Sequence, residues 1–190
     1  MKQLIECVPN FSEGNNLQII ERIVEEIKSV EGVKVIDVDS GKATNRTVVT
    51  FVGPPEAVCE AAFRAVKKAA ELIDMRKHKG EHPRFGATDV LPLVPIKGIS
   101  MEEVSAYAKK LGQRIGNELE IPVYCYEFAA AEDKRRNLAN CRSGEYEGLP
   151  QKLADPAWQP DFGPATWNEK VQKTGATAVG ARHLLIAYNI

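Results

Sequence analysis

The strongest constraint on the fold is an alternation of short apolar runs with longer segments of helical periodicity. Apolar residues recur every three or four positions from Leu17 to Val30, which predicts a helix with one buried face. Two more helices are predicted, from Gly53 to Leu72 behind a pair of prolines and from Ser100 to Ile115 behind a capping box. Short runs rich in β-branched residues predict strands at 5–8, 33–39, 46–52, 90–96 and 122–126.

The order of these elements indicates the fold class. We interpret it as β-α-β-β-α-β, spread over residues 3 to about 128, which is typical of a ferredoxin-like split β-α-β arrangement. An α+β sandwich of this type is therefore expected. Pro92 and Pro95 predict that the strand at 90–96 is an edge or irregular strand, because proline cannot donate to a sheet. The apolar run from Ala181 to Ile190 predicts one more strand.

Between these regions lies a segment of different character, from Ala129 to about Lys173. It contains both tryptophans, several prolines and a short candidate helix that includes Arg135, Arg136 and Leu138. Ordered but irregular segments of this length are usually functional, since ordering them costs entropy that binding or packing must recover. We therefore expect this segment to contribute to a binding site.

Composition excludes several classes of protein. The chain has 190 residues with 25 Lys and Arg against 26 Asp and Glu, so it lacks the basic excess typical of nucleic-acid binders. No apolar run approaches the roughly 20 residues of a membrane span, and the N-terminus has no signal-peptide core. The four cysteines form no CxxC pair, which argues against zinc. A cytoplasmic protein that binds neither nucleic acid nor membrane, and no metal, is predicted.

Two of the three histidines, His78 and His82, lie four residues apart in a polar loop. Three interpretations stay open: a solvated loop, a metal site in a hydrolase, and a proton-transfer site. Gly80 and Pro83 disfavour the continuous helix that would place both imidazoles on one face. Histidine titrates near neutral pH, and Glu81 and Arg84 flank His82 with opposite charges. His82 is therefore the preferred candidate for proton transfer.

Other catalytic signals are missing or ambiguous. The sequence has no glycine-rich phosphate loop of the GxxxxGK[ST] or GxGxxG type and no GxSxG nucleophile motif. The basic cluster Lys134–Arg136 suits carboxylate binding, but a solvated charged surface is the favoured explanation.

Several blocks of sequence resemble the formiminotransferase (glutamate formimidoyltransferase) family. They run in order along the chain, from residue 6 to the C-terminal region, and blocks of this length are more specific than a short motif. The blocks are Glu6–Gly14, Thr50–Glu56, Gly80–Ala87, Gly144–Pro150, Asp161–Pro164, Gly175–Thr177 and Gly180–Arg182.

The resemblance implies transfer of a formimino group from N-formimino-L-glutamate to tetrahydrofolate in histidine degradation, with folate as co-substrate. It implies that His82 is the catalytic residue and that family members are dimers built from two similar subdomains. It also implies folate contacts along one stretch: Gly163, Pro164, Ala165, Thr166, Trp167, Asn168, Glu169, Lys170, Val171 and Gln172.

This chemistry suggests roles for further residues. One imidazole can take a proton from folate N5 and then protonate the departing glutamate nitrogen. Both substrates carry carboxylates, for which Arg84, Arg46 and the cluster Lys134–Arg136 are candidate anchors. Asp39, at the end of a predicted strand, is a candidate contact for the pterin, or simply an acid at a strand end.

Two expectations concern the chain as a whole. By resemblance, residues 1–180 are the N-terminal subdomain, and residues 181–190 begin a strand leading into a C-terminal subdomain that this sequence lacks. That strand is expected to be an exposed edge, paired with a second copy or with a C-terminal subdomain. The alternative function is a non-enzymatic folate-binding or interaction module made of the first subdomain alone.

Overall fold

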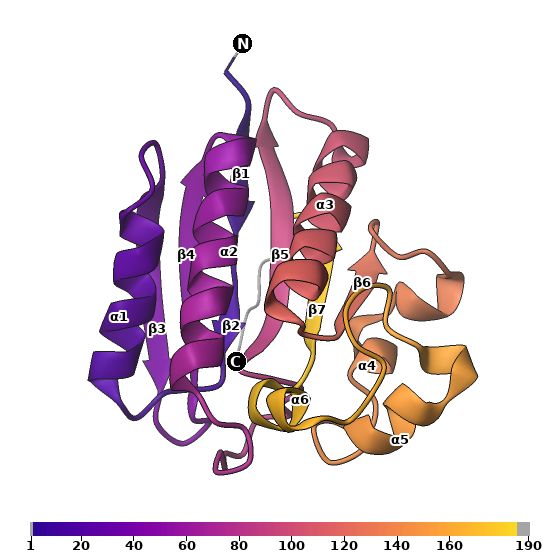
Figure 1. The fold of residues 1–190 in the computed structure, drawn as a ribbon. Helices are drawn as coiled ribbons and strands as arrows, with labels where there is room; N and C mark the ends of the chain where they lie inside the picture. Colours follow the sequence, from indigo (N-terminus) through magenta and orange to yellow (C-terminus); the bar gives the residue numbers. More distant parts are fainter. Residues whose placement is uncertain (1, 186–190) are drawn as a thin grey trace.

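A seven-stranded mixed sheet runs through the molecule in the order β3, β4, β1 with β2, β5, β7 and β6 (Figure 1). The structure is a computed structural model that describes residues 2–185. The strands are β1 (Leu4–Cys7), β2 (Asn10–Phe11), β3 (Lys34–Gly41), β4 (Arg46–Gly53), β5 (Thr88–Lys97), β6 (Val123–Glu127) and β7 (Thr177–Ala181).

Three long helices lie on one face of this sheet, and shorter ones follow β6 (Figure 1). The long helices are α1 (Leu17–Lys28), α2 (Pro55–Leu72) and α3 (Met101–Leu119). The shorter ones are α4 (Leu138–Cys141), α5 (Leu149–Ala154) and α6 (Glu169–Thr174), with 3-10 turns η1 (Asp133–Arg135) and η2 (Pro156–Trp158). Within residues 2–185, no helix is both long enough and apolar enough to cross a membrane.

The α+β class is confirmed, but the β-α-β-β-α-β unit is shorter than predicted. It occupies Leu4–Lys97. There β1 and β2 each pair antiparallel with β4 and β5, and β3 pairs antiparallel with β4. Helix α3 and strand β6 then extend the sheet, with β7 inserted as a parallel neighbour of both β5 and β6. The predicted limit at residue 128 was wrong because it assigned this parallel extension to the unit.

Of the two predictions for the proline-containing strand, the edge position was wrong, whereas the irregular pairing is confirmed by register shifts opposite β1 and β2. Strand β5 pairs with β1 and β2 on one side and with β7 on the other. Pro92 still accepts a hydrogen bond from the Val8 N–H at 3.3 Å. Pro95 lies beyond Leu93, where pairing with β7 ends, and faces a register shift beside Ile5. This central strand tolerates both prolines because the neighbouring strands make no regular hydrogen bonds at the two positions where a backbone N–H is missing.

The last predicted strand is displaced. Strand β7 ends at Ala181, and residues 182–185 have no regular structure, with Leu184 and Leu185 exposed. The expectation of an edge strand from 181 onward was therefore wrong for residues 182–185, and residues 186–190 lie outside the described residues. The strand that does form there is internal to the sheet.

The sheet has a separate apolar core on each face. Alternate residues of a strand point to opposite faces, so Val123 and Cys125 pack beneath the long helices while Tyr124 and Tyr126 point to the other face. There the tyrosines pack with residues of the segment 129–173, including Leu149, Leu153 and Val171. The irregular segment is thus a second layer over the β5–β7–β6 half of the sheet.

Candidate active site

Five polar side chains from separate parts of the chain meet near the end of the sheet where β2, β4 and β5 lie side by side. Hydrogen bonds join three of them, an ion pair joins the other two, and the charges of that pair act on the histidine; we call the group the His82 cluster. Its members are Asn10 on β2, Arg46 at the start of β4, His82 in the loop between α2 and β5, Asp89 on β5, and Arg142 directly after α4.

The loop that carries His82 is fastened to the turn between β3 and β4. Asn45, in the left-handed conformation with φ of 47°, donates from its side-chain amide to the Lys79 carbonyl at 2.8 Å. A Cβ atom at Gly80 would lie 2.5 Å from the Thr44 carbonyl oxygen, so only glycine permits this close approach. These contacts hold the backbone two residues before His82.

The hydrogen bonds of His82 define its tautomer. Nδ1 lies 2.6 Å from the Pro83 carbonyl oxygen, so it carries the proton and donates it. Nε2 is then the basic nitrogen, and it accepts from the Arg46 guanidinium, whose other terminal nitrogen donates to Asn10. Burial lowers the pKa of His82 most, and the positive charges of Arg46 and Arg142 lower it further; the bond to Pro83 and the charge of Asp89 oppose this, and the net shift is downward. A neutral imidazole with a basic Nε2 results.

We expect His82 to titrate below its ordinary pKa of about 6.5. Replacing Arg46 by Gln should raise the pKa of His82, because one of the charges that disfavour the imidazolium is removed. Because the folded-state pKa is lowered, the stability that this group contributes is full above the ordinary pKa and is lost as pH falls below it. NMR titration of the imidazole measures the shift.

Arg136→Gln is the matched control for this titration, since that guanidinium is exposed and pairs with Asp133 outside the His82 cluster. A His82 pKa that moves equally in both variants, or falls in Arg46→Gln, would contradict the electrostatic account.

A buried ion pair, between Asp89 and Arg142, forms the interior part of the cluster. Asp89 is 2% exposed, and one carboxylate oxygen accepts from Arg142 at 2.6 Å while the other accepts from the Phe85 N–H at 2.9 Å. Burial raises the pKa of Asp89, although Arg142 opposes this shift. The Arg142 side chain is 20% exposed, although its Nε–H is shielded from solvent.

A small cavity of about 10 Å³ lies beside His82. The residues that border it include His78, Arg84 and Asp89. His78 donates from Nε2 to the Asn45 carbonyl at 2.9 Å, and Arg84 forms an ion pair with Glu147. Within residues 2–185, no three His, Cys, Asp or Glu side chains are grouped as a metal site would need. Both Nε2 atoms already face hydrogen-bond partners, which gives the two-histidine metal site no support.

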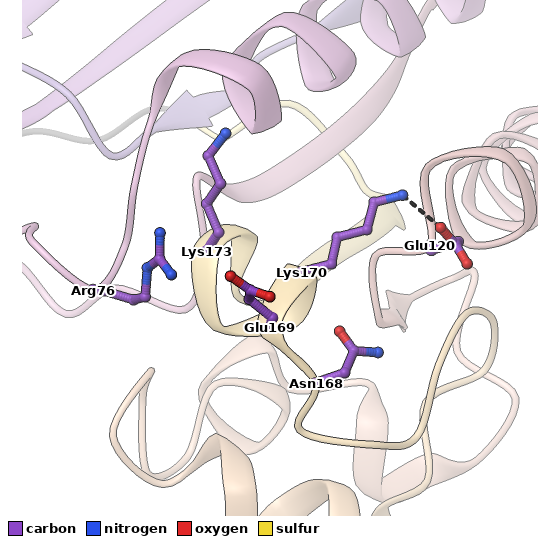
Figure 2. Close-up of a pocket in the computed structure, with 6 residues that line it drawn as sticks. All are labelled: Arg76, Glu120, Asn168, Glu169, Lys170 and Lys173. Carbon is purple, nitrogen blue, oxygen red and sulfur yellow. Dashed lines mark hydrogen bonds and ion pairs between the residues drawn. The ribbon is translucent and has the colours of Figure 1, made fainter.

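The stretch 163–172, expected to contact folate, borders a different and larger pocket of about 490 Å³ (Figure 2). Asn168, Glu169 and Lys170 line it, and Lys170 pairs with Glu120 across it at 2.6 Å. Arg76 and Lys173 complete a mixed lining of three basic residues, two acidic residues and one amide.

Other residues of this stretch are held by the fold. Val171 is buried, and Trp167 packs against Tyr146 with ring centroids 5.4 Å apart. Gly163, with φ of 84°, lies directly against the Ile121 carbonyl. The folate role of this stretch stays a prediction.

The remaining candidates lie apart from His82. Asp39 is exposed on the edge strand β3, opposite Val48, which in turn lies opposite Asn10. Directly opposed side chains share a face of the sheet, so Asp39 is on the same face as Asn10, with strand β4 between them. In the basic cluster, Lys134 donates to a backbone carbonyl, and Arg135 is buried against Asp161 at 2.8 Å. Two of the three basic residues therefore brace the irregular segment.

Sequence reasoning missed three members of the His82 cluster. Asn10 falls within a block of family resemblance but was not singled out. Asp89 is the lone charged residue of the buried run 88–94, which was a usable signal because isolated buried acids need partners. Arg142 carries no such signal, because 53 residues separate it from Asp89.

Comparison with known proteins identifies a family for the whole described region. The model of the formiminotransferase domain, N-terminal subdomain, matches residues 4–182. Formimidoyltransferase-cyclodeaminase of Rattus norvegicus is 54% identical over 190 residues, which are 100% of this chain and 35% of that protein. Glutamate formimidoyltransferases of Streptococcus pyogenes and Thermoplasma acidophilum are each 48% identical, with 62% and 61% of their lengths covered. The chain thus spans about a third to three-fifths of these relatives.

Proposed function

This chain belongs to the formiminotransferase family, where it matches the N-terminal subdomain, and from that membership we propose that it contributes the catalytic histidine of a folate-dependent formimino transfer. The donor is N-formimino-L-glutamate and the acceptor is tetrahydrofolate, as in histidine degradation. The observation that carries the proposal is the hydrogen bonding of His82, whose Nδ1 donates to Pro83 and whose Nε2 faces Arg46, in surroundings that lower its pKa.

His82 suits both proton transfers of this reaction. As folate N5 attacks the formimino carbon, Nε2 takes the N5 proton and the imidazole becomes positively charged. The tetrahedral adduct then collapses: the imidazolium protonates the glutamate nitrogen, the carbon–nitrogen bond to glutamate breaks, and the imidazole is neutral again. Since Arg46 occupies Nε2 in the free protein, the substrate must displace it before the first proton moves.

The same membership suggests how the chain is completed. We infer that residues 1–180 act as the N-terminal subdomain and that residues 181–190 lead toward a second subdomain supplying the rest of the folate site. The greater lengths of the relatives support this inference. The homodimer, the cytoplasmic location, and the folate roles of Asp39 and 163–172 stay predictions.

A transfer assay tests the function. We expect glutamate release from formiminoglutamate, dependent on tetrahydrofolate, when this chain is mixed with a separately produced C-terminal subdomain of a relative, and less or none with the chain alone. Calorimetry with a reduced folate is run in parallel. Folate binding without turnover in the mixture would instead support the non-enzymatic folate-binding module.

A further inference from the structure

Three arginines around His82 have buried N–H groups that lack an acceptor. The Nε–H of Arg46, of Arg84 and of Arg142 is shielded from solvent and has no hydrogen-bond partner within residues 2–185. Buried donors are nearly always paired in folded proteins, and exceptions mark a strained site or a missing partner. Three such donors in one neighbourhood indicate an acceptor that comes from outside the chain.

Arg142 differs from the other two in having a complete free edge. Its Nη1 donates to Asp89, whereas neither Nε nor Nη2 has a partner in the described part of the chain. In Arg46 both terminal nitrogens are engaged, and in Arg84 the Nη2 is taken by Glu147. The Nε–Nη2 edge of a guanidinium matches the two oxygens of a carboxylate.

The charges of the neighbourhood favour an anion. Arg46, Arg84 and Arg142 face two carboxylates, those of Asp89 and Glu147, and Glu147 is 61% exposed. Glu81 adjoins His82 in the sequence but forms no ion pair within residues 2–185, so no carboxylate pairs with Arg46, the guanidinium that contacts the imidazole. Asp89 fixes the guanidinium of Arg142 through Nη1, and Nε is shielded from solvent, so a ligand first makes contact at the exposed part of a side chain that is 20% exposed.

We propose that Arg142, held by Asp89, determines donor specificity by binding the α-carboxylate of formiminoglutamate next to His82. This inference rests on the proposed function and adds to it the subsite that recognises the donor. In formiminoglutamate the nitrogen that must be protonated and the α-carboxylate are bonded to the same carbon. A carboxylate anchored on Arg142 therefore brings the leaving nitrogen close to the imidazole, and donors without an α-carboxylate lose this anchor.

Titration of N-formyl-L-glutamate, a stable analogue of the donor, into the chain tests the proposal. We expect saturable binding in the wild type and at least tenfold weaker binding in Arg142→Lys. Lysine keeps the charge and the pairing with Asp89 but has no pair of parallel N–H groups to bind both carboxylate oxygens. Arg136→Lys makes the same change on an exposed arginine outside the cluster and should bind as the wild type does. Bound dicarboxylate should also raise the pKa of His82, measured by NMR, in the wild type alone.

A double variant, Asp89→Asn with Arg142→Gln, removes both charges of the pair together and keeps two side chains that can hydrogen-bond. It replaces Arg142→Lys in the binding experiment if that variant does not fold. Unchanged binding in either folded variant overturns the proposal, as does failure of the wild type to bind the probe.

The transfer assay separates this inference from the proposed function. Transfer by the mixed subdomains with an unchanged donor KM in Arg142→Lys overturns the role of Arg142 and leaves the function standing. If binding of N-formyl-L-glutamate depends on Arg142 but no mixture shows transfer, the carboxylate subsite is supported. The proposed formimino transfer is then ruled out.

Discussion

Replacing His82 by alanine is expected to lower the rate of formimino transfer by about 100- to 10,000-fold, the range typical of a lost general acid–base catalyst. The imidazole serves twice in the proposed reaction, so its removal slows both attack by folate N5 and departure of glutamate. The loss should appear in kcat, because His82 moves protons in the transition state, while the KM for folate changes little. Steady-state kinetics of the chain mixed with a C-terminal subdomain measure both parameters.

His78→Gln is the matched control for this measurement. His78 lines the same cavity, but it donates to the Asn45 carbonyl, a bond that a glutamine amide can also form. We expect this variant to keep most of the wild-type kcat. Wild-type turnover in a folded His82→Ala variant would rule out the catalytic role, and equal losses in the two variants would point to disruption of the loop.

The long elements of this fold are readable from sequence because their signals are local. Helical periodicity placed a helix at residues 17–30, and α1 occupies Leu17–Lys28. The place of β5 in the sheet is not readable in this way, since pairing depends on strands that lie elsewhere in the chain. The prolines indicated an edge or an irregular strand, and the second alternative holds: the neighbouring strand breaks at Val8 and Pro9, so Pro92 needs no N–H there.

The candidate site, like the fold, has local features that the sequence predicts and long-range features that it does not. His82 could be proposed from the composition of its own loop, in which Gly80 and Pro83 restrict the backbone. The environment that keeps it neutral could not, because Arg46 and Arg142 reach it from 36 and 60 residues away in the chain. Electrostatic surroundings arise from tertiary structure, and single-sequence patterns contain little information about them.

Replacing Asp89 by alanine is expected to destabilise the fold by about 3–5 kcal/mol, the cost of breaking a buried ion pair by removing one partner. The change leaves the Arg142 charge without its carboxylate and the Phe85 N–H without its acceptor. For a chain of this size, each kcal/mol lowers the melting temperature by roughly 2–4 °C. Thermal or urea denaturation followed by circular dichroism gives the change in free energy of unfolding.

Asp133→Ala is the control for this prediction, since that carboxylate is fully exposed and lies 3.9 Å from Arg136; exposed pairs of this kind contribute little. The double variant Asp89→Asn with Arg142→Gln should recover part of the loss, because no unpaired charge stays buried. If Asp89→Ala unfolds at the wild-type temperature, the pair does not support the fold, and the argument that Asp89 positions Arg142 loses its structural basis. If the double variant is stable but fails to bind N-formyl-L-glutamate, the charge pair acts in recognition as well as in stability.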